Sequence, residues 1–201
     1  MHRPHRRRIL AGLPLLAASP AIAAPARRPR VTIRTDHGVM TVELEAEKAP
    51  VTTGNFLRYV DTGKYDGGVF YRRTRARGGA PTEGTVVAKP NPRSHPFPPI
   101  AHESTRKTGL RHRLGTLSLG RFAPGSATGD FFICTADTPA YDAHSGSGDT
   151  EGYAAFGQVV AGLPVLRRIH AQKADGASPF PDQKGEWLNP PVVILQARRS
   201  A

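Results

Sequence analysis

A chain of 201 residues with 38% hydrophobic and 22% charged residues fits one domain that buries a core without disulfide staples. The single cysteine, Cys134, excludes an intramolecular disulfide. The formal charge of +12 raises the possibility of nucleic acid binding, but the cationic residues are scattered through turns and form no recognised reader motif. We therefore expect a solvated basic surface or attraction to anionic envelope components, and no nucleic acid partner.

The first 23 residues have the pattern of an export signal peptide. Residues 1–8 are basic, residues 9–18 are apolar with small side chains, and Ala21-Ile22-Ala23 fits a small-x-small cleavage site. The apolar run is too short, and too broken by Pro14 and Pro20, to span a bilayer. We therefore expect export without stable membrane insertion.

The basic start of this segment also suggests an export route. Arg6-Arg7-Arg8-Ile9-Leu10 resembles the bacterial twin-arginine signal, although His5 replaces the usual polar residue before it. The sequence thus predicts a periplasmic protein with a linker at 24–30 and one domain at 31–199.

The N-terminal part of that domain predicts a hairpin, a helix and a short strand. Residues 31–35 and 39–44 alternate with period two around a turn. Residues 49–62 have apolar side chains at helical spacing, with proline near the start and glycine after the end. Residues 69–73 indicate a strand, whereas the glycines and prolines of 74–114 predict loops around one apolar patch at 85–88.

The C-terminal part predicts more strands and a second helix. The strands are expected at 115–119, 131–136, 154–160 and 190–197, and the helix at 163–171. The acids of the loop at 142–152 lack the spacing of a calcium loop, so this loop is expected to be solvated and to hold no metal. Many short strands with two distant helices favour a mainly β fold, an antiparallel barrel with helices capping its ends.

Phe131 and Phe132 are the most informative pair in the chain. Successive side chains of a strand point to opposite faces, so one phenylalanine can fill the core while the other lines a site. The pattern alone leaves open a buried strand with both rings in the core. Cys134 is expected to pack as a small apolar group, because nothing in the sequence places a base beside it.

Five segments occur in the order found in one known family: APVTTGNFL at 49–57, YDGGVFYR at 65–72, GTLSL at 115–119, DFFICT at 130–135 and FGQV at 156–159. On these segments the chain from Val31 to Arg199 resembles the cyclophilin-type peptidyl-prolyl cis-trans isomerases, in particular exported bacterial members. The resemblance implies a closed eight-stranded antiparallel β-barrel capped by two α-helices. It also implies a monomer that needs no cofactor and acts on proline-containing polypeptides.

The resemblance assigns roles to particular residues. Arg72 matches the catalytic arginine, in Phe70-Tyr71-Arg72 where the family usually has Phe-His-Arg; without the resemblance it would be one surface arginine among many. Phe132 matches the phenylalanine of the proline pocket, and Phe131 matches an inward core position. The other substrate-binding positions implied by the resemblance are Leu119, Gly120, Arg121, Asp130, Tyr141 and Tyr153.

The chain also departs from the family pattern. The family's Pro-Gly-Phe-Met-x-Gln-Gly-Gly after the arginine is replaced by the shorter Arg73–Gly79, so the pocket is expected to lack one wall and Arg72 its orienting glutamine. Asp130 replaces a glutamine and is expected to pair with Arg72 or a neighbouring arginine. Tyr153 replaces a histidine.

Two functions follow from this balance of matches and departures. One is a periplasmic prolyl isomerase for exported polypeptides, which captures the proline ring and donates a hydrogen bond from Arg72 to the prolyl nitrogen. The other is a catalytically weak, cyclophilin-like peptide-binding module or chaperone, because loss of supporting residues commonly loosens a site.

Overall fold

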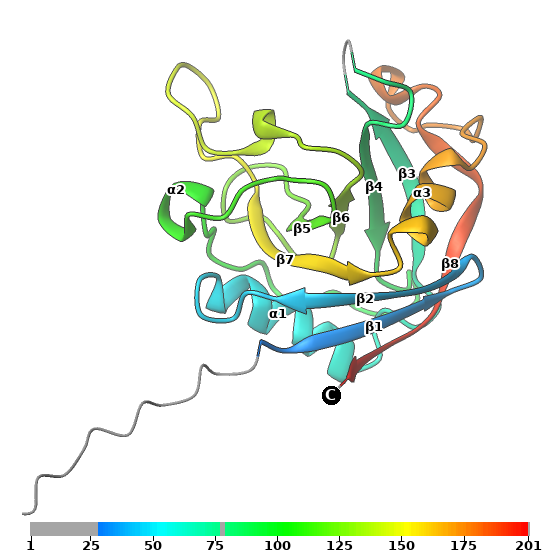
Figure 1. The fold of residues 1–201 in the computed structure, drawn as a ribbon, viewed down its shortest axis with the longest axis horizontal. Coiled ribbons are helices and arrows are strands. Elements are labelled where there is room, and N and C mark those ends of the chain that lie inside the picture. Colours follow the sequence, from blue (N-terminus) through cyan, green and yellow to red (C-terminus); the bar gives the residue numbers. More distant parts are fainter. Residues whose placement is uncertain (1–27, 77–78, 201) are drawn as a thin grey trace, which may run out of the picture.

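The computed structural model describes residues 28–76 and 79–200. The predicted export segment, residues 1–23, and the first part of the linker lie outside the described residues. Eight antiparallel strands close into a barrel in the order β1-β2-β7-β5-β6-β4-β3-β8 (Figure 1). The strands are β1 (Arg30–Thr35), β2 (Gly38–Leu44), β3 (Val69–Arg75), β4 (Gly84–Lys89), β5 (Thr116–Leu119), β6 (Phe131–Cys134), β7 (Ala154–Ala161) and β8 (Trp187–Ser200). This confirms the predicted closed eight-stranded barrel.

The barrel closes where β8 lies beside β1. Arg30 of β1 is paired with Glu43 of β2 on one side and with Ser200 of β8 on the other. Along β1 the side chains of Val31 and Ile33 are buried while their neighbours are not, as the period-two pattern predicts. The barrel has no free edge, because every strand is paired on both sides.

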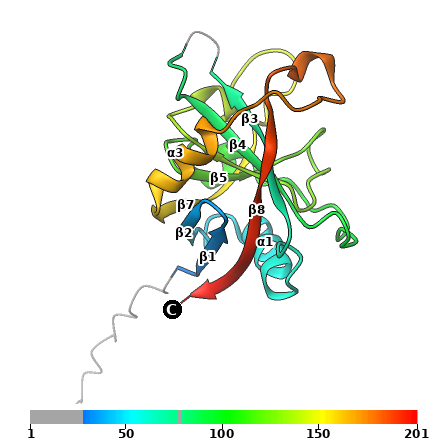
Figure 2. The same cartoon turned by 90° about the vertical axis from the view of Figure 1, so that its right-hand side faces the viewer.

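Two helices cover the barrel: α1 (Pro50–Asp61) and α3 (Leu163–Ala171). Proline stands in the first turn of each helix, where its missing N–H costs no hydrogen bond. They lie on opposite sides of the barrel in Figure 2, with α1 against β7 and β8 and α3 against β2 and β4. Shorter helical turns are α2 (Thr105–Thr108), η1 (Pro139–Tyr141) and η2 (Pro181–Gln183).

The barrel interior is filled by a row of opposed residues that crosses five strands. Neighbours in this row face each other across antiparallel pairs and therefore share one face. Their order from β8 to β5 is Val192, Phe70, Ala88, Phe131 and Leu119, and all five are buried. We call these five residues the inner row.

Aromatic contacts fix Phe131 within this core. Its ring meets those of Phe56, Tyr65 and Phe70 edge-on, with centroids 5.4, 5.3 and 5.8 Å apart. Edge-to-face pairs at this separation add to the stabilisation that comes from burial. Phe131 therefore has the inward core position expected for it.

The sequence misjudged two strands. Residues 84–89 form β4 inside the region expected to be loops, because β4 is buried on both faces and so lacks the alternating pattern. Strand β8 begins at Trp187, three residues before the expected start at residue 190. The prolines at 190 and 191 concealed this beginning, since proline normally argues against a strand interior.

Candidate active site

A pocket of about 540 Å³ lies on the outer face of the barrel, over β3, β4 and β6. It is built on a second row of opposed residues, next to the inner row but on the other face of the same strands. From β8 to β5 this row is Trp187, Arg72, Val87, Phe132 and Ser118, and we call it the outer row. All of these except Ser118 line the pocket.

A β-bulge on β3 brings two successive side chains to this face. The register shifts between Phe70 and Arg72, so that Tyr71 is the extra residue on β3. Bulges of this kind re-aim side chains beside functional sites. Phe70 consequently points into the core while Tyr71 and Arg72 both line the pocket.

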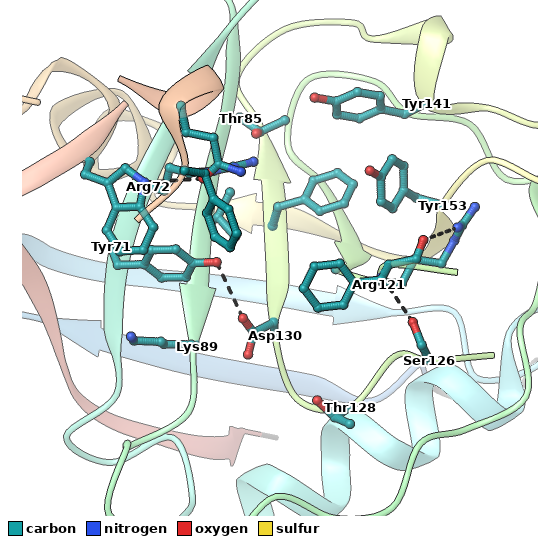
Figure 3. A pocket seen from close by; sticks show the side chains of 17 residues that line it. Tyr71, Arg72, Thr85, Lys89, Arg121, Ser126, Thr128, Asp130, Tyr141 and Tyr153 are labelled. Atoms are coloured by element: carbon teal, nitrogen blue, oxygen red, sulfur yellow. Dashed lines mark hydrogen bonds between the residues drawn. The ribbon is translucent and has the colours of Figure 1, made fainter. Parts of the chain in front are cut away.

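Arg72 reaches the pocket from β3, and its guanidinium end points toward the opposite side, where Tyr141, Tyr153 and Arg121 lie (Figure 3). Its Nε is buried and makes no hydrogen bond among the described residues. The nearest acid is Glu186, with Oε2 3.7 Å from Nε. Glu186 thus lies at ion-pair distance from one side of the guanidinium, at Nε, without a hydrogen bond.

Phe132 belongs to a small apolar cluster separate from the barrel core. It is 4% exposed, packs with Val87 and Cys134, and meets the rings of Tyr141 and Tyr153 edge-on at 5.4 and 5.2 Å. Burial raises the pKa of the Cys134 thiol to about 12, so the thiol stays protonated and packs as a small apolar group. Phe131 and Phe132 therefore serve opposite faces of β6.

Asp130 has a different partner from the one expected. The Tyr71 hydroxyl donates to Asp130 Oδ2 at 3.5 Å, and the ion pairs of residues 28–76 and 79–200 include none between Asp130 and an arginine. Burial raises the pKa of Asp130, and the nearby Lys89 ammonium opposes this shift. The prediction that Asp130 pairs with Arg72 or a neighbouring arginine is wrong, because the partner of Asp130 is Tyr71 and the acid beside Arg72 is Glu186.

The wall opposite Phe132 comes from the segment that leads into β8. The Trp187 ring lies 5.0 Å from the Tyr71 ring, and its Nε1 donates to Gln183 Oε1 at 3.3 Å. Phe180 and Gln183 also line the pocket from this segment. The sequence predicted a missing wall, but a distant segment supplies one. The only tryptophan in the chain was the signal that could have drawn attention to it.

Arg121 ties two loops together at the rim of the pocket. It forms an ion pair with Asp149 and donates to the carbonyl oxygens of Gly152 and Phe122. Its side chain is only 3% exposed, and its guanidinium lies 5.1 Å from the centre of the Tyr153 ring. The loop at 142–152 is solvated over residues 144–149, as predicted, while Asp142 and Gly152 near its two ends are buried.

A buried polar chain supports Phe132 from behind. His112 Nδ1 lies 2.7 Å from Asp142 Oδ1, His112 Nε2 lies 3.0 Å from Ser118 Oγ, and the imidazole stacks on the Phe132 ring at 5.9 Å. Burial lowers the pKa of His112, although Asp142 opposes the shift. Neutral His112 donates from Nδ1 to the carboxylate and accepts from Ser118. Ser118 is fully buried, so this chain has no access to substrate and supports the pocket instead.

The predicted substrate-binding residues fall into two groups. Gly120, Arg121, Asp130, Phe132, Tyr141 and Tyr153 line the same pocket as Arg72. Leu119 does not, because it faces Phe131 across β5 and β6 and therefore belongs to the inner row. Further lining residues that sequence reasoning missed are Tyr71, Thr85, Val87, Lys89, Phe122, Ser126, Thr128, Phe180, Gln183 and Trp187.

The match to a family model agrees with this architecture. Residues 30–199 match the model of the cyclophilin type peptidyl-prolyl cis-trans isomerases. The chain therefore belongs to the cyclophilin family, a family of peptidyl-prolyl cis-trans isomerases.

Two relatives support the same assignment, and one solved structure shares the fold. The chain is 34% identical to peptidyl-prolyl cis-trans isomerase A of Dickeya dadantii over 96% of this chain and 97% of that protein. It is 33% identical to isomerase B of Escherichia coli over 69% and 82% of the two chains. A cyclophilin of Cryptosporidium parvum, crystallised in the presence of the dipeptide Ala-Pro, shares the fold with a TM-score of 0.66 at 17% identity, over 86% and 99% of the two chains.

No α-helix found in residues 28–76 and 79–200 has the length and apolar character needed to cross a membrane.

Proposed function

We propose that this protein catalyses cis-trans isomerisation of X-Pro bonds in exported polypeptides, with Arg72 as the hydrogen-bond donor and Phe132 as the contact for the proline ring. The observation that carries the proposal is the outer row. Arg72 and Phe132 both face Val87 of β4, from its two neighbouring strands, and line one pocket. Both groups come from one barrel, so one chain supplies the donor and the apolar contact.

The reaction requires a binding site for a twisted amide and no nucleophile. Rotation about a peptide bond must break amide resonance behind a barrier of about 18–20 kcal/mol. An X-Pro bond has only a small trans preference yet exchanges over about tens to hundreds of seconds. A catalyst must therefore bind the twisted form better than either planar form.

Arg72 and Phe132 divide this task. As the amide twists, the lone pair of the prolyl nitrogen becomes available as an acceptor, and an N–H aimed at it favours the twisted form. The guanidinium of Arg72 presents several such N–H groups in a rigid plane. The Phe132 ring and the tyrosines around it supply an apolar surface on which the proline ring is held while the preceding residue rotates.

Arg72→Ala tests the donor role. The variant is expected to lower the catalysed exchange of an Ala-Pro-containing peptide, measured by NMR, by about 100-fold, as for loss of one preorganised donor. Arg34→Ala removes an exposed arginine of β1 that does not line the pocket, and serves as the matched control. Unchanged exchange in Arg72→Ala would refute the donor role.

The same assay separates the two candidate functions. Exchange above the uncatalysed rate in the wild-type protein excludes the weak binding module. Suppression of client aggregation without exchange supports it. The second function rests on two expected losses, one wall of the pocket and the glutamine that orients Arg72. The Phe180–Trp187 segment lines the pocket and weakens the first of these grounds.

The proposed place of action is the periplasm. What supports it is the pattern of residues 1–23, with its basic start, apolar middle and small-residue cleavage site. Fractionation of cells expressing the full chain is expected to recover a shortened protein with the periplasmic proteins. Replacement of Arg6 and Arg7 by lysine tests the twin-arginine route, since precursor should then accumulate inside the cell.

A further inference from the structure

We propose that Glu186 is a positioning residue that orients Arg72 for catalysis. This inference rests on the proposed function and goes beyond it, because Glu186 lies in a segment that none of the five family-like segments includes. In the sequence Glu186 stands 114 residues after Arg72 (186 − 72), so no local pattern connects the two.

The geometry leaves Arg72 with one anionic neighbour at its Nε. Glu186 Oε2 lies 3.7 Å from that nitrogen, which is buried and makes no hydrogen bond with any of the described residues. Both side chains are largely shielded, with 22% and 29% of their surfaces exposed, so water screens the pair less than it would screen an exposed pair. An anchor at Nε leaves the terminal nitrogens of the guanidinium to face the pocket.

Glu186 is itself held by the backbone of two elements. Its carbonyl oxygen accepts from the Arg73 N–H at 2.8 Å, and its own N–H donates to the Gln183 carbonyl oxygen at 3.1 Å. The next residue, Trp187, lies directly opposite Arg72 in the outer row. These hydrogen bonds fix the backbone of Glu186 beside β3. A residue that orients another side chain needs such a fixed position.

The charge around Glu186 gives the pair a measurable pH dependence. The charged groups that act on its carboxyl are Arg72 on β3 and Asp182 on η2. Burial raises the pKa of Glu186 above its usual value of 4.5, while Arg72 opposes the shift. As the pH falls through this raised pKa, Glu186 becomes neutral and its hold on Arg72 weakens.

The test compares Glu186→Ala, Glu186→Gln and the control Glu47→Gln, which removes the same charge from an exposed site outside the pocket. Maximal exchange of an Ala-Pro-containing peptide is measured by NMR, and peptide affinity by the fluorescence of Trp187, the only tryptophan. Glu186→Ala is expected to lower maximal exchange by about 10- to 100-fold, as for a misplaced catalytic group, and affinity by less than about threefold.

Two further readouts distinguish orientation from simple structural support. Glu186→Gln, which keeps a polar oxygen beside Arg72 without the charge, should retain more exchange than Glu186→Ala, and its rate should no longer fall with pH as the wild-type rate does. The ¹⁵N signal of Arg72 Nε should shift in Glu186→Ala and stay unchanged in Glu47→Gln.

Three results would overturn the inference. Exchange by Glu186→Ala within about twofold of wild type would show that Arg72 needs no such partner. An equal loss of rate and affinity would show that Glu186 only maintains the wall. A wild-type protein without catalysed exchange would instead overturn the proposed function, and with it any task for Glu186.

Discussion

The inner and outer rows cross the same five strands side by side, yet they differ in composition and in what they contact. The inner row is entirely apolar and fills the barrel. The outer row places an arginine and a serine among its apolar members and faces the pocket over most of its length. One sheet thus holds stability on one face and chemistry on the other, because adjacent residues of a strand point in opposite directions.

The largest expected difference between the rows lies between Phe131 and Phe132. Phe132→Ala should lower the catalysed exchange rate by about 100-fold, since the proline ring loses its main contact. Phe131→Ala should cost about 3–5 kcal/mol of folding stability through the cavity it leaves, with the rate per folded molecule nearly unchanged. Denaturant unfolding and NMR exchange measure the two effects.

Substitution by leucine tests the same difference with less risk that the variants fail to fold. Phe131→Leu and Phe132→Leu make the same change on the two faces of β6. Both should lower the free energy of unfolding, but only Phe132→Leu should slow exchange. If both variants slow exchange equally per folded molecule, the functional distinction between the rows is wrong.

A smaller effect is expected at the β8 end of the outer row. Trp187→Ala removes the ring packed against Tyr71 and should weaken binding of an Ala-Pro peptide by about tenfold, or about 1.4 kcal/mol. Isothermal titration calorimetry is the measurement, because the variant lacks the fluorescent group. Trp187→Phe keeps an aromatic wall and should bind within about threefold of wild type. Equal binding by all three proteins would show that this wall does not contact the peptide.

The smallest expected effect is the pH dependence of the support behind Phe132. Burial lowers the pKa of His112 below 6.5, so the unfolded chain binds more protons and stability is lost as the pH falls below 6.5. His170 contributes in the same direction, since burial lowers its pKa as well. Asp130 and Glu186 act oppositely at lower pH, because their pKa values are raised.

Thermal unfolding between pH 7 and pH 5 checks this expectation. His112→Gln should reduce the loss of stability on acidification without abolishing it, since His170 still titrates. A pH dependence identical to that of the wild type would show that His112 does not contribute.

The sequence predicted those features of the fold that depend on residues close together in the chain. The hairpin at 31–44, the two helices and the separation of Phe131 from Phe132 were predictable, because they depend on local periodicity and chain order. The family-like segments then placed Arg72 and Phe132 in one site. Leu119 was misplaced because its face depends on strand register, which no local pattern fixes.

The remaining part of the site depends on contacts between distant segments. Glu186 and Trp187 reach Arg72 only because β8 pairs with β3, and the prolines after them concealed the start of that strand. Asp142 was predicted to be a solvated acid in a loop. It is instead buried against His112, which lies 30 residues earlier in the chain. Sequence can indicate such residues by type, but the tertiary contact decides their partners.

Because β8 closes the barrel, the barrel can close only late in synthesis of the chain. β8 follows the seven other strands in the chain and pairs with both β1 and β3, which are made much earlier. While residues 187–200 are still inside the ribosome, β1 and β3 remain unpaired edges that another chain can join. The pocket also lacks Trp187 at that stage. A nascent chain therefore completes neither the barrel nor the lining of the pocket before β8 has emerged.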